Sequence, residues 1–309
     1  MSAHDFLRDP LPPGLADLPA LMHPAERQLL YNLARHHCSG RGEVVELGAF
    51  FGGSAAALAA GLKDRGAAGR VRTFDRFDCA SGSAFAGLVQ RFAAAHEIDF
   101  LLAERDGRLD FFGCFEDVTY PYAAWISATR AELSELKWEG SVELLHVDMP
   151  KTYAQLREAV RRVYAHLLPS AFVVLQDYVY HWSAELIAAT MAMRRRGLVA
   201  PATLVETSLV LRAARAPDAA DAAWLDAQID DPAGVIRLLD EAQAELDGST
   251  HAGTVLRLAA AQYRVAHGMA AEGEARIEEV LAQARSAPFA ADVEARVREM
   301  RKHGFVMPE

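Results

Sequence analysis

The stretch from Glu43 to Ser54 constrains the fold of this chain more than any other. It reads Glu-Val-Val-Glu-Leu-Gly-Ala-Phe-Phe-Gly-Gly-Ser and continues into an alanine-rich segment that ends near Asp64. A short apolar strand, a glycine turn and a helix start are typical of an open α/β sheet, in which ligands bind at the carboxyl ends of the strands. The turn lacks both the G-x-G-x-x-G spacing of dinucleotide folds and the Gly-Lys-Ser/Thr of a phosphate loop. Glu46, which precedes the glycines, suits a ligand with a positive centre better than a pyrophosphate.

A second strand with an acidic end supports a ligand site at this turn. Residues 71–74 are predicted to form the strand, and Asp75 follows it directly. An acid at the end of the second strand commonly binds ribose hydroxyls in such a crevice. The first two strands therefore predict a nucleoside-bearing ligand.

These residues resemble the S-adenosylmethionine site of class I methyltransferases. The matching motifs are Glu-Leu-Gly with Phe-Gly-Gly-Ser, and Thr-Phe-Asp-Arg-Phe at 73–77. Leu-Leu-His-Val-Asp at 144–148 and Leu-Gln-Asp-Tyr at 175–178 are similar, more narrowly, to the macrocin O-methyltransferase family, over roughly residues 25–213. The resemblance implies transfer of a methyl group from S-adenosylmethionine to a sugar hydroxyl or similar natural-product metabolite. It implies these cofactor-binding residues: Glu46, Gly48, Phe51, Gly52, Ser54, Asp75, Phe77 and Ser127.

The predicted fold class is α/β, a Rossmann-like methyltransferase sheet with an antiparallel edge hairpin, followed by a small all-α domain. Three regions are predicted: an extended arm over 1–22, the methyltransferase domain over 23–215, and a helical, tetratricopeptide-like domain over 216–309. Further strands are predicted at 124–128, 142–147 and 172–175, with the hairpin at 202–205 and 208–212, and a helix at 152–168. Residues 97–119 give no readable pattern.

Acidic residues follow two neighbouring predicted strands. Asp148 comes directly after the strand at 142–147, and Gln176 and Asp177 come directly after the strand at 172–175. Because parallel strands end at one edge of a sheet, these side chains are expected near the Glu46 turn. Carboxylate and amide oxygens suit Mg²⁺, which lowers the pKa of a bound hydroxyl. Asp148, Gln176 and Asp177 are therefore the predicted metal ligands, and Asp148 is also a predicted catalytic residue.

The chemical half of the site departs from the family pattern. Pro150 stands where the family has an acid that serves as general base, and Gln176 replaces the first of two adjacent aspartates. His181, Tyr178 and His146 are the candidate replacement bases, with His181 favoured because it follows the strand end. Two alternatives stay open: a metal-independent methyltransferase with His181 or Tyr178 as base, or a non-catalytic module that binds cofactor or assembles partners.

Composition limits the binding partners and the cellular location that we expect. The net charge of −10 argues against a nucleic-acid partner, which needs a concentrated basic face. No apolar stretch approaches the ~20 residues of a membrane span. Three cysteines without a Cys-x-x-Cys pair predict a reduced, cytoplasmic protein. A small-molecule acceptor and a homo-oligomer are expected as partners.

Overall fold

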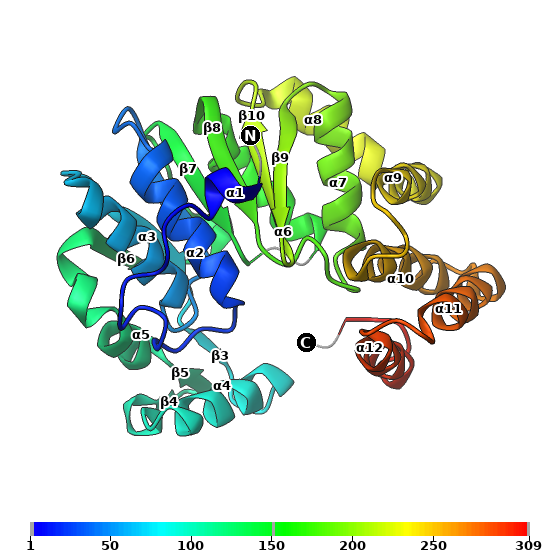
Figure 1. Cartoon of the computed structure of the whole chain (residues 1–309), viewed down its shortest axis with the longest axis horizontal. Helices are drawn as coiled ribbons and strands as arrows, with labels where there is room; N and C mark the ends of the chain where they lie inside the picture. The colour runs from blue at the N-terminus through cyan, green and yellow to red at the C-terminus, as the bar shows by residue number, and fades with distance from the viewer. Residues whose placement is uncertain (1–2, 150–151, 308–309) are drawn as a thin grey trace.

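A seven-stranded sheet forms the centre of the computed structural model, which describes residues 3–149 and 152–307 (Figure 1). β10 runs antiparallel to both its neighbours, and the other adjacent strands are parallel. The order across the sheet is β6 (Ile126–Arg130), β2 (Val71–Asp75), β1 (Glu43–Leu47), β7 (Val142–Val147), β8 (Leu167–Leu175), β10 (Ser208–Ala213) and β9 (Val199–Val205). The predicted α/β sheet with its antiparallel edge hairpin is confirmed.

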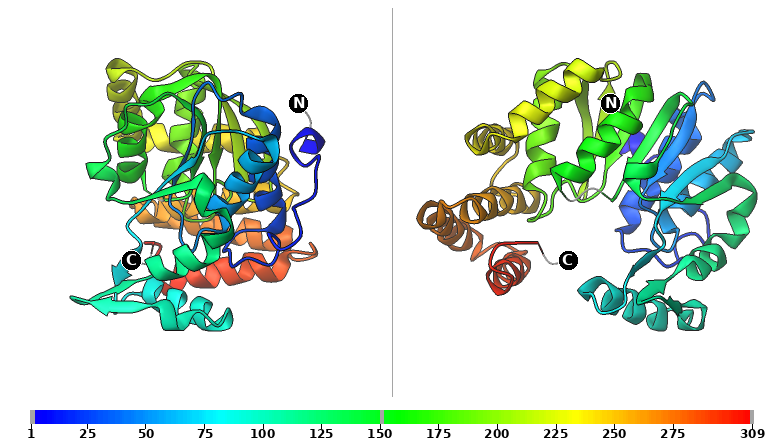
Figure 2. Two further views of the ribbon diagram at one scale, coloured as in Figure 1. Left: turned by 90° about the vertical axis from the view of Figure 1, so that its left-hand side faces the viewer. Right: turned by 180° about the vertical axis from the view of Figure 1, so that it is seen from behind.

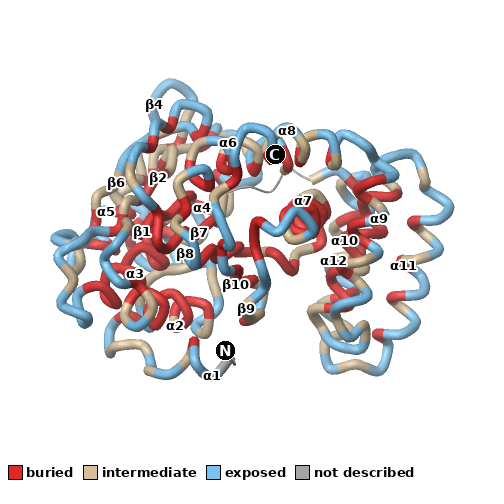
Figure 3. The backbone as a smooth tube through the Cα atoms, turned by 90° about the horizontal axis from the view of Figure 1, so that it is seen from above, coloured by how far each residue is buried: buried red, intermediate tan, exposed pale blue. Residues whose placement is uncertain are grey.

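Helices cover both faces of the sheet, which explains why every residue of β7 is buried. One face carries α2 (Pro24–Asn32), α3 (Gly53–Arg65) and α5 (Phe112–Thr119). The other face carries α6 (Tyr153–Arg162) and α7 (Ala184–Arg195). Figure 3 shows the burial concentrated in the strands and in α3 and α7. Continuous apolar strands are expected where both faces of a parallel sheet are covered.

A second, smaller sheet lies partly within residues 97–119, the region without a readable pattern. Between β2 and α5 lie β3 (Asp78–Ala80), α4 (Ala84–Ala95), β4 (Ala103–Arg105) and β5 (Arg108–Asp110). The three strands pair antiparallel in the order β3-β5-β4. Strands of three residues are too short to leave a period-2 pattern in the sequence. Figures 1 and 2 show this insert and the C-terminal α12 (Ala290–Lys302) beyond the carboxyl ends of the large sheet.

Several element bounds predicted from the sequence were wrong. The strands β8 and β9 begin at Leu167 and Val199 and not at residues 172 and 202. The edge strand β6 begins at Ile126, because residues 120–125 form a 3₁₀ helix. The helix predicted to Leu168 ends at Arg162, since β8 begins at Leu167. The arm, predicted as wholly extended, contains a short helix, α1 (Ala3–Phe6), which precedes the first proline.

Helices α8 to α12 follow the sheet. The residues of α8 (Ala219–Ile229), α9 (Pro232–Glu245) and α10 (His251–Ala266) pack into the same core as β7, β8 and α7. A separate apolar cluster joins Trp182 to α10, α11 (Ala270–Ala284) and α12. The domain boundary at residue 215 stays a prediction. In the described part of the chain, no helix has the length and apolar character needed to cross a membrane.

Candidate functional site

The glycine turn between β1 and α3 needs its two glycines for backbone conformation and for space. Gly48 and Gly52 have φ values of 89° and 88°, which favour glycine. A Cβ at Gly48 would lie 2.9 Å from the backbone nitrogen of Met149, just after β7. A Cβ at Gly52 would lie 2.3 Å from Cγ2 of Thr119 on α5. The turn is therefore packed between the end of β7 and α5.

Asp75, at the end of β2, fixes the shape of this turn. Its Oδ2 accepts hydrogen bonds from the backbone N–H of Ala49 (2.8 Å) and Phe50 (3.1 Å). Its Oδ1 accepts one from the N–H of Phe77 (2.7 Å). Burial raises the pKa of Asp75 and the nearby Glu46 carboxylate adds to this, although the three N–H bonds oppose the change. Asp75, the acid predicted to bind the cofactor, is therefore next to the turn, and its surroundings make the ionised carboxylate less favourable.

Glu46 lies below the turn, fully buried in the sheet. Its Oε2 accepts a hydrogen bond from Oγ1 of Thr73 on β2 (2.9 Å), and its Oε1 lies 3.2 Å from Nδ1 of His146 on β7. Both partners stand opposite Glu46 in the strand register, so the three side chains share one face. In this conformation both carboxylate oxygens have protein partners, so Glu46 supports the turn from beneath.

His146 continues this buried row toward Gln176. Burial alone would lower the pKa of His146, but the Glu46 and Asp148 carboxylates and the Gln176 side chain raise it above its ordinary value. Nε2 of His146 and Oε1 of Gln176 are both buried without a hydrogen bond of normal geometry. Sequence reasoning named His146 only as a candidate base and missed Thr73. Polar residues inside two otherwise buried strands were the signal for the row.

The remaining predicted cofactor residues lie in different surroundings. Phe51 and Phe77 are fully buried; Phe51 stacks on Phe50 with ring centroids 4.2 Å apart, and Phe77 packs 4.8 Å from Phe115. Ser54 is buried in the first turn of α3. Ser127 pairs in register with Arg72, three residues before the level of Asp75. The structure therefore brings Ser54 and the two rings close to the turn, whereas Ser127 lies back from the carboxyl edge.

The three predicted metal ligands lie at the ends of β7 and β8. Backbone bonds join these ends, because Asp148 N donates to Leu47 O (2.9 Å) and Gln176 N donates to Val147 O (3.0 Å). Asp148 and Asp177 are half-buried, whereas Gln176 is buried beside His146. In the described ranges, no group of three or more His, Cys, Asp or Glu side chains is arranged to hold a metal ion. Pro150 lies outside the described residues.

The two favoured candidate bases, His181 and Tyr178, are both buried. His181 is 1% exposed, and its Nδ1 lies 3.2 Å from Nη1 of Arg296 on α12. Burial, with a smaller effect of Arg296, lowers the pKa of His181 to about 3. Burial raises the pKa of the Tyr178 phenol above its ordinary value. Neither group is placed or tuned to accept a proton at neutral pH.

One cavity lies at the opposite, amino edge of the sheet. It has a volume of about 660 Å³ and is lined by residues 38–44, 65–70, Leu62 and Ser141. Its walls include none of the predicted site residues.

Comparison with known proteins agrees with this geometry. Residues 45–178 match a family model described as a methyltransferase domain. A comparison with curated proteins found no match. Among solved structures, the O-methyltransferase NovP is similar with 13% identity and a TM-score of 0.46, over 64% of this chain and 83% of that one.

Two more solved structures are similar. One is CalS11, a TDP-rhamnose 3'-O-methyltransferase of calicheamicin biosynthesis, with 17% identity and a TM-score of 0.38 over 60% of this chain and 76% of that one. The other is the methyltransferase PaMTH1 of Podospora anserina, with 13% identity and a TM-score of 0.41 over 64% and 80%. The matched segment 45–178 runs from β1 to just past β8 and contains the turn and Asp75. The chain therefore contains a segment that matches a methyltransferase domain, an enzyme domain, and this segment includes most of the parallel strands of the large sheet.

Proposed function

We propose that this enzyme transfers the methyl group of S-adenosylmethionine to a hydroxyl oxygen of a small acceptor, a sugar or a similar natural-product metabolite. The observation that carries the proposal is the glycine turn, fixed by Asp75 at the carboxyl edge of the matched domain. The similarity of residues 144–148 and 175–178 to macrocin O-methyltransferases supports oxygen as the methyl acceptor.

The turn offers complementary charge to both ends of the cofactor. The N-terminus of α3 carries partial positive charge, which favours the carboxylate of the methionine part. Asp75 is a half-buried acid beside the same turn, and a sulfonium cation or ribose hydroxyl there offsets the cost of its charge. Gly48 and Gly52 allow the backbone to approach the ligand closely. We therefore assign cofactor binding to the turn, Ser54 and Asp75, with Glu46 as support.

The residues present do not fit a divalent metal. A hard cation of this kind requires several oxygen donors that converge on one point. Gln176 is buried, and its side chain helps to raise the pKa of the His146 ring. Asp148 and Asp177 alone make a poor site for a hard cation. We therefore derive no step through a metal.

Asp148 is the residue we assign to the acceptor. It lies at the end of β7, next to the turn that holds the donor. The acceptor oxygen attacks the methyl carbon in line, the bond from carbon to sulfur breaks, and neutral S-adenosylhomocysteine leaves. The hydroxyl proton passes to the Asp148 carboxylate as the bond forms. Orientation of the two substrates supplies much of the rate, and the base typically adds about 10²- to 10⁴-fold.

A transfer assay tests this assignment. The enzyme is incubated with methyl-labelled S-adenosylmethionine and a panel of sugar nucleotides and free glycosides, with and without a chelator. We expect O-methylated product that persists after chelation, and about a 100-fold lower kcat for Asp148→Asn. Loss of activity on chelation, restored by Mg²⁺, would show that the metal assignment is wrong. Methylation only at nitrogen or carbon would contradict the proposed acceptor.

We also propose a cytoplasmic location and a homo-oligomeric state. The three free and buried cysteines support a reducing compartment. Sedimentation of the purified protein tests the oligomeric state.

A further inference from the structure

We infer that Arg27 is a positioning residue that holds residues 15–20, called here the strap, as a wall over the cofactor turn and so sets the affinity for S-adenosylmethionine. The inference rests on the proposed function, because it assumes that the cofactor binds at the turn. Arg27 lies on α2, outside the matched segment 45–178.

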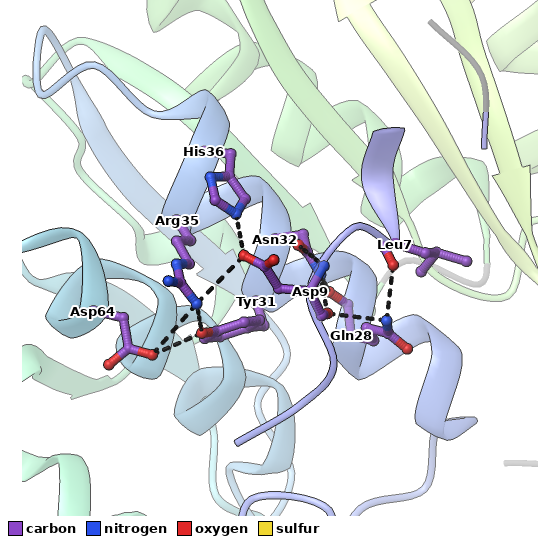
Figure 4. A network of polar contacts seen from close by, with 8 residues as sticks. All are labelled: Leu7, Asp9, Gln28, Tyr31, Asn32, Arg35, His36 and Asp64. Atoms are coloured by element: carbon purple, nitrogen blue, oxygen red, sulfur yellow. Dashed lines mark hydrogen bonds and ion pairs between the residues drawn. The ribbon is translucent and has the colours of Figure 1, made fainter. Parts of the chain in front are cut away.

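The N-terminal arm is attached to α2 at two separate places. The first is near the start of the arm, where Nε2 of Gln28 donates to the backbone oxygens of Leu7 (3.0 Å) and Asp9 (2.9 Å) (Figure 4). Asn32 adds a hydrogen bond from Nδ2 to Asp9 O (2.8 Å). This attachment fixes residues 7–9 and leaves the strap to be held by other contacts.

The second attachment is the guanidinium of Arg27. Its Nη1 donates to the backbone oxygens of Leu15 (2.9 Å) and Leu18 (3.1 Å), and its Nη2 donates to Ala16 O (2.9 Å). Arg27 is only 6% exposed, so these charge-assisted bonds are largely shielded from water. One side chain therefore satisfies three carbonyl groups of a segment that otherwise has few hydrogen bonds of its own.

The strap touches the cofactor turn at Gly53. A Cβ at Gly53 would lie 2.5 Å from Cβ of Ala20 and 2.7 Å from the backbone oxygen of Pro19. Gly53 is the first residue of α3, and the free N–H groups at the start of a helix are suited to bind an anion. A strap at this distance keeps water from the helix start. The attraction between the helix N-terminus and the cofactor carboxylate is stronger in such a shielded position.

The neighbouring residue, Glu26, fixes the position from which Arg27 acts. Its buried Oε1 accepts hydrogen bonds from Oγ1 of Thr207 (2.7 Å) and Oγ of Ser208 (2.8 Å), at the turn between β9 and β10. Its Oε2 accepts one from the N–H of His23 (2.9 Å) at the start of α2. The first turn of α2 is thus tied to the large sheet, and Arg27 holds the strap relative to that sheet.

Calorimetric titration with S-adenosylhomocysteine tests the inference in the full-length chain. We expect Arg27→Met to weaken binding about tenfold, because the freed carbonyls gain water and the strap is released. Arg27→Lys keeps the positive charge but replaces the forked guanidinium with a single ammonium group. We expect an intermediate loss of affinity. Gln28→Ala is the matched control: it removes two hydrogen bonds to the same arm from the next residue, and unchanged affinity is expected.

Amide hydrogen exchange without ligand separates the strap from the cofactor site. Arg27→Met should speed exchange in residues 14–21 and leave residues 43–65 unchanged. Faster exchange with unchanged affinity would overturn the role in cofactor binding, as would an equal loss in Gln28→Ala. Unchanged exchange would overturn the hold on the strap. If the unaltered chain does not bind S-adenosylhomocysteine at all, the proposed cofactor site fails, and the exchange result still reports on the strap.

If Arg27→Met does not fold, Gly53→Ala serves as a second variant. The added methyl group displaces Ala20, and alanine is well tolerated inside a helix. We expect faster exchange in the strap and weaker binding of S-adenosylhomocysteine. Slow exchange in this variant would overturn the close contact between the strap and α3.

Discussion

The two ends of β1 are closed in the same way but serve different purposes. At the amino end, Glu143 of β7 accepts hydrogen bonds from the backbone N–H of Ser39 and Gly40 and from the Ser39 hydroxyl, with further contacts to Arg41 and Gly42. At the carboxyl end, Asp75 of β2 accepts bonds from Ala49, Phe50 and Phe77. In both places a carboxylate from a neighbouring strand holds a glycine-containing loop.

The two carboxylates differ in how easily they carry charge. Burial alone would raise the pKa of Glu143, but the Ser39 hydroxyl and the surrounding N–H groups outweigh it and lower the pKa. At Asp75 the balance is reversed, since burial beside Glu46 raises the pKa despite three N–H bonds. The amino end is therefore a satisfied structural closure. The carboxyl end holds an anion that a cationic ligand would stabilise further.

Removal of the carboxylate at the carboxyl end should have the largest effect. Asp75→Ala frees three N–H groups of the turn and removes the charge beside the cofactor. We expect about a 100-fold loss of affinity for S-adenosylmethionine, measured by calorimetry. Unchanged affinity would show that the turn does not bind the cofactor.

The same change at the amino end should affect stability alone. Glu143→Ala leaves the N–H groups around Ser39 and Gly40 without their acceptor. We expect the free energy of unfolding to fall by about 2 to 3 kcal/mol in urea titrations. The cofactor affinity of Glu143→Ala should stay within about twofold of that of the unaltered chain. A large loss of affinity would show that the two ends of β1 do not differ in function.

Glu46 tests whether the buried row supports the turn or binds the cofactor. Glu46→Gln keeps a hydrogen-bonding side chain but removes the charge opposite His146. We expect a loss of about 1 to 2 kcal/mol in stability and less than about a threefold change in cofactor affinity. If affinity falls as far as in Asp75→Ala, Glu46 contacts the cofactor directly and our placement of it is wrong.

The contributions of Glu143 and Asp75 to folding stability should change with pH in opposite directions. These are the smallest of the predicted effects. Glu143 has a lowered folded pKa, so its contribution to stability is present above 4.5 and is lost as pH falls through the folded value. Asp75 has a raised folded pKa, so its contribution is present below 3.8 and is lost as pH rises through the folded value. Cofactor affinity should weaken as Asp75 takes up its proton.

Urea titrations between pH 3 and pH 8 measure both effects. The difference in stability between the unaltered chain and Glu143→Gln should shrink as the pH falls below 4.5. A difference that stays constant over this range would mean that the charge on Glu143 does not contribute.

Local patterns were enough to predict the large sheet and most of its helices. The apolar segment 142–147 predicted β7 without error, and residues 216–309, predicted to be all-α, form helices α8 to α12. The short strands of the insert were not predicted, because strands of three residues such as Asp78–Ala80 leave no periodic signal. The start of β6 was misplaced, because residues 120–125 have apolar and aromatic side chains but form a 3₁₀ helix.

The site was only partly predictable for a different reason. The glycine turn and the acid beside it could be recognised in the sequence, because turn chemistry is local and its residue types are few; their role in cofactor binding stays a prediction. His181 was misjudged as an accessible base, since nothing near it in sequence shows that Arg296 and α12 pack over it. Gln176 was predicted to be a metal ligand, but its side chain is buried and raises the pKa of His146 on the neighbouring strand. The strap depends on contacts between α2 and residues 15–18, which no motif encodes.

The sequence by itself determined the order of strands and helices, the two glycines of the turn and the acid that closes it. These features follow from side-chain periodicity and backbone conformation, which act over a few residues. The tertiary structure decided which polar groups are buried, which carboxylates share a partner and which segment covers the turn. Those outcomes depend on burial and on pairs of residues far apart in the chain, such as Glu46 with His146 and Arg27 with the strap. Burial is also what sets the charge balance of Asp75, and so the chemistry of the site.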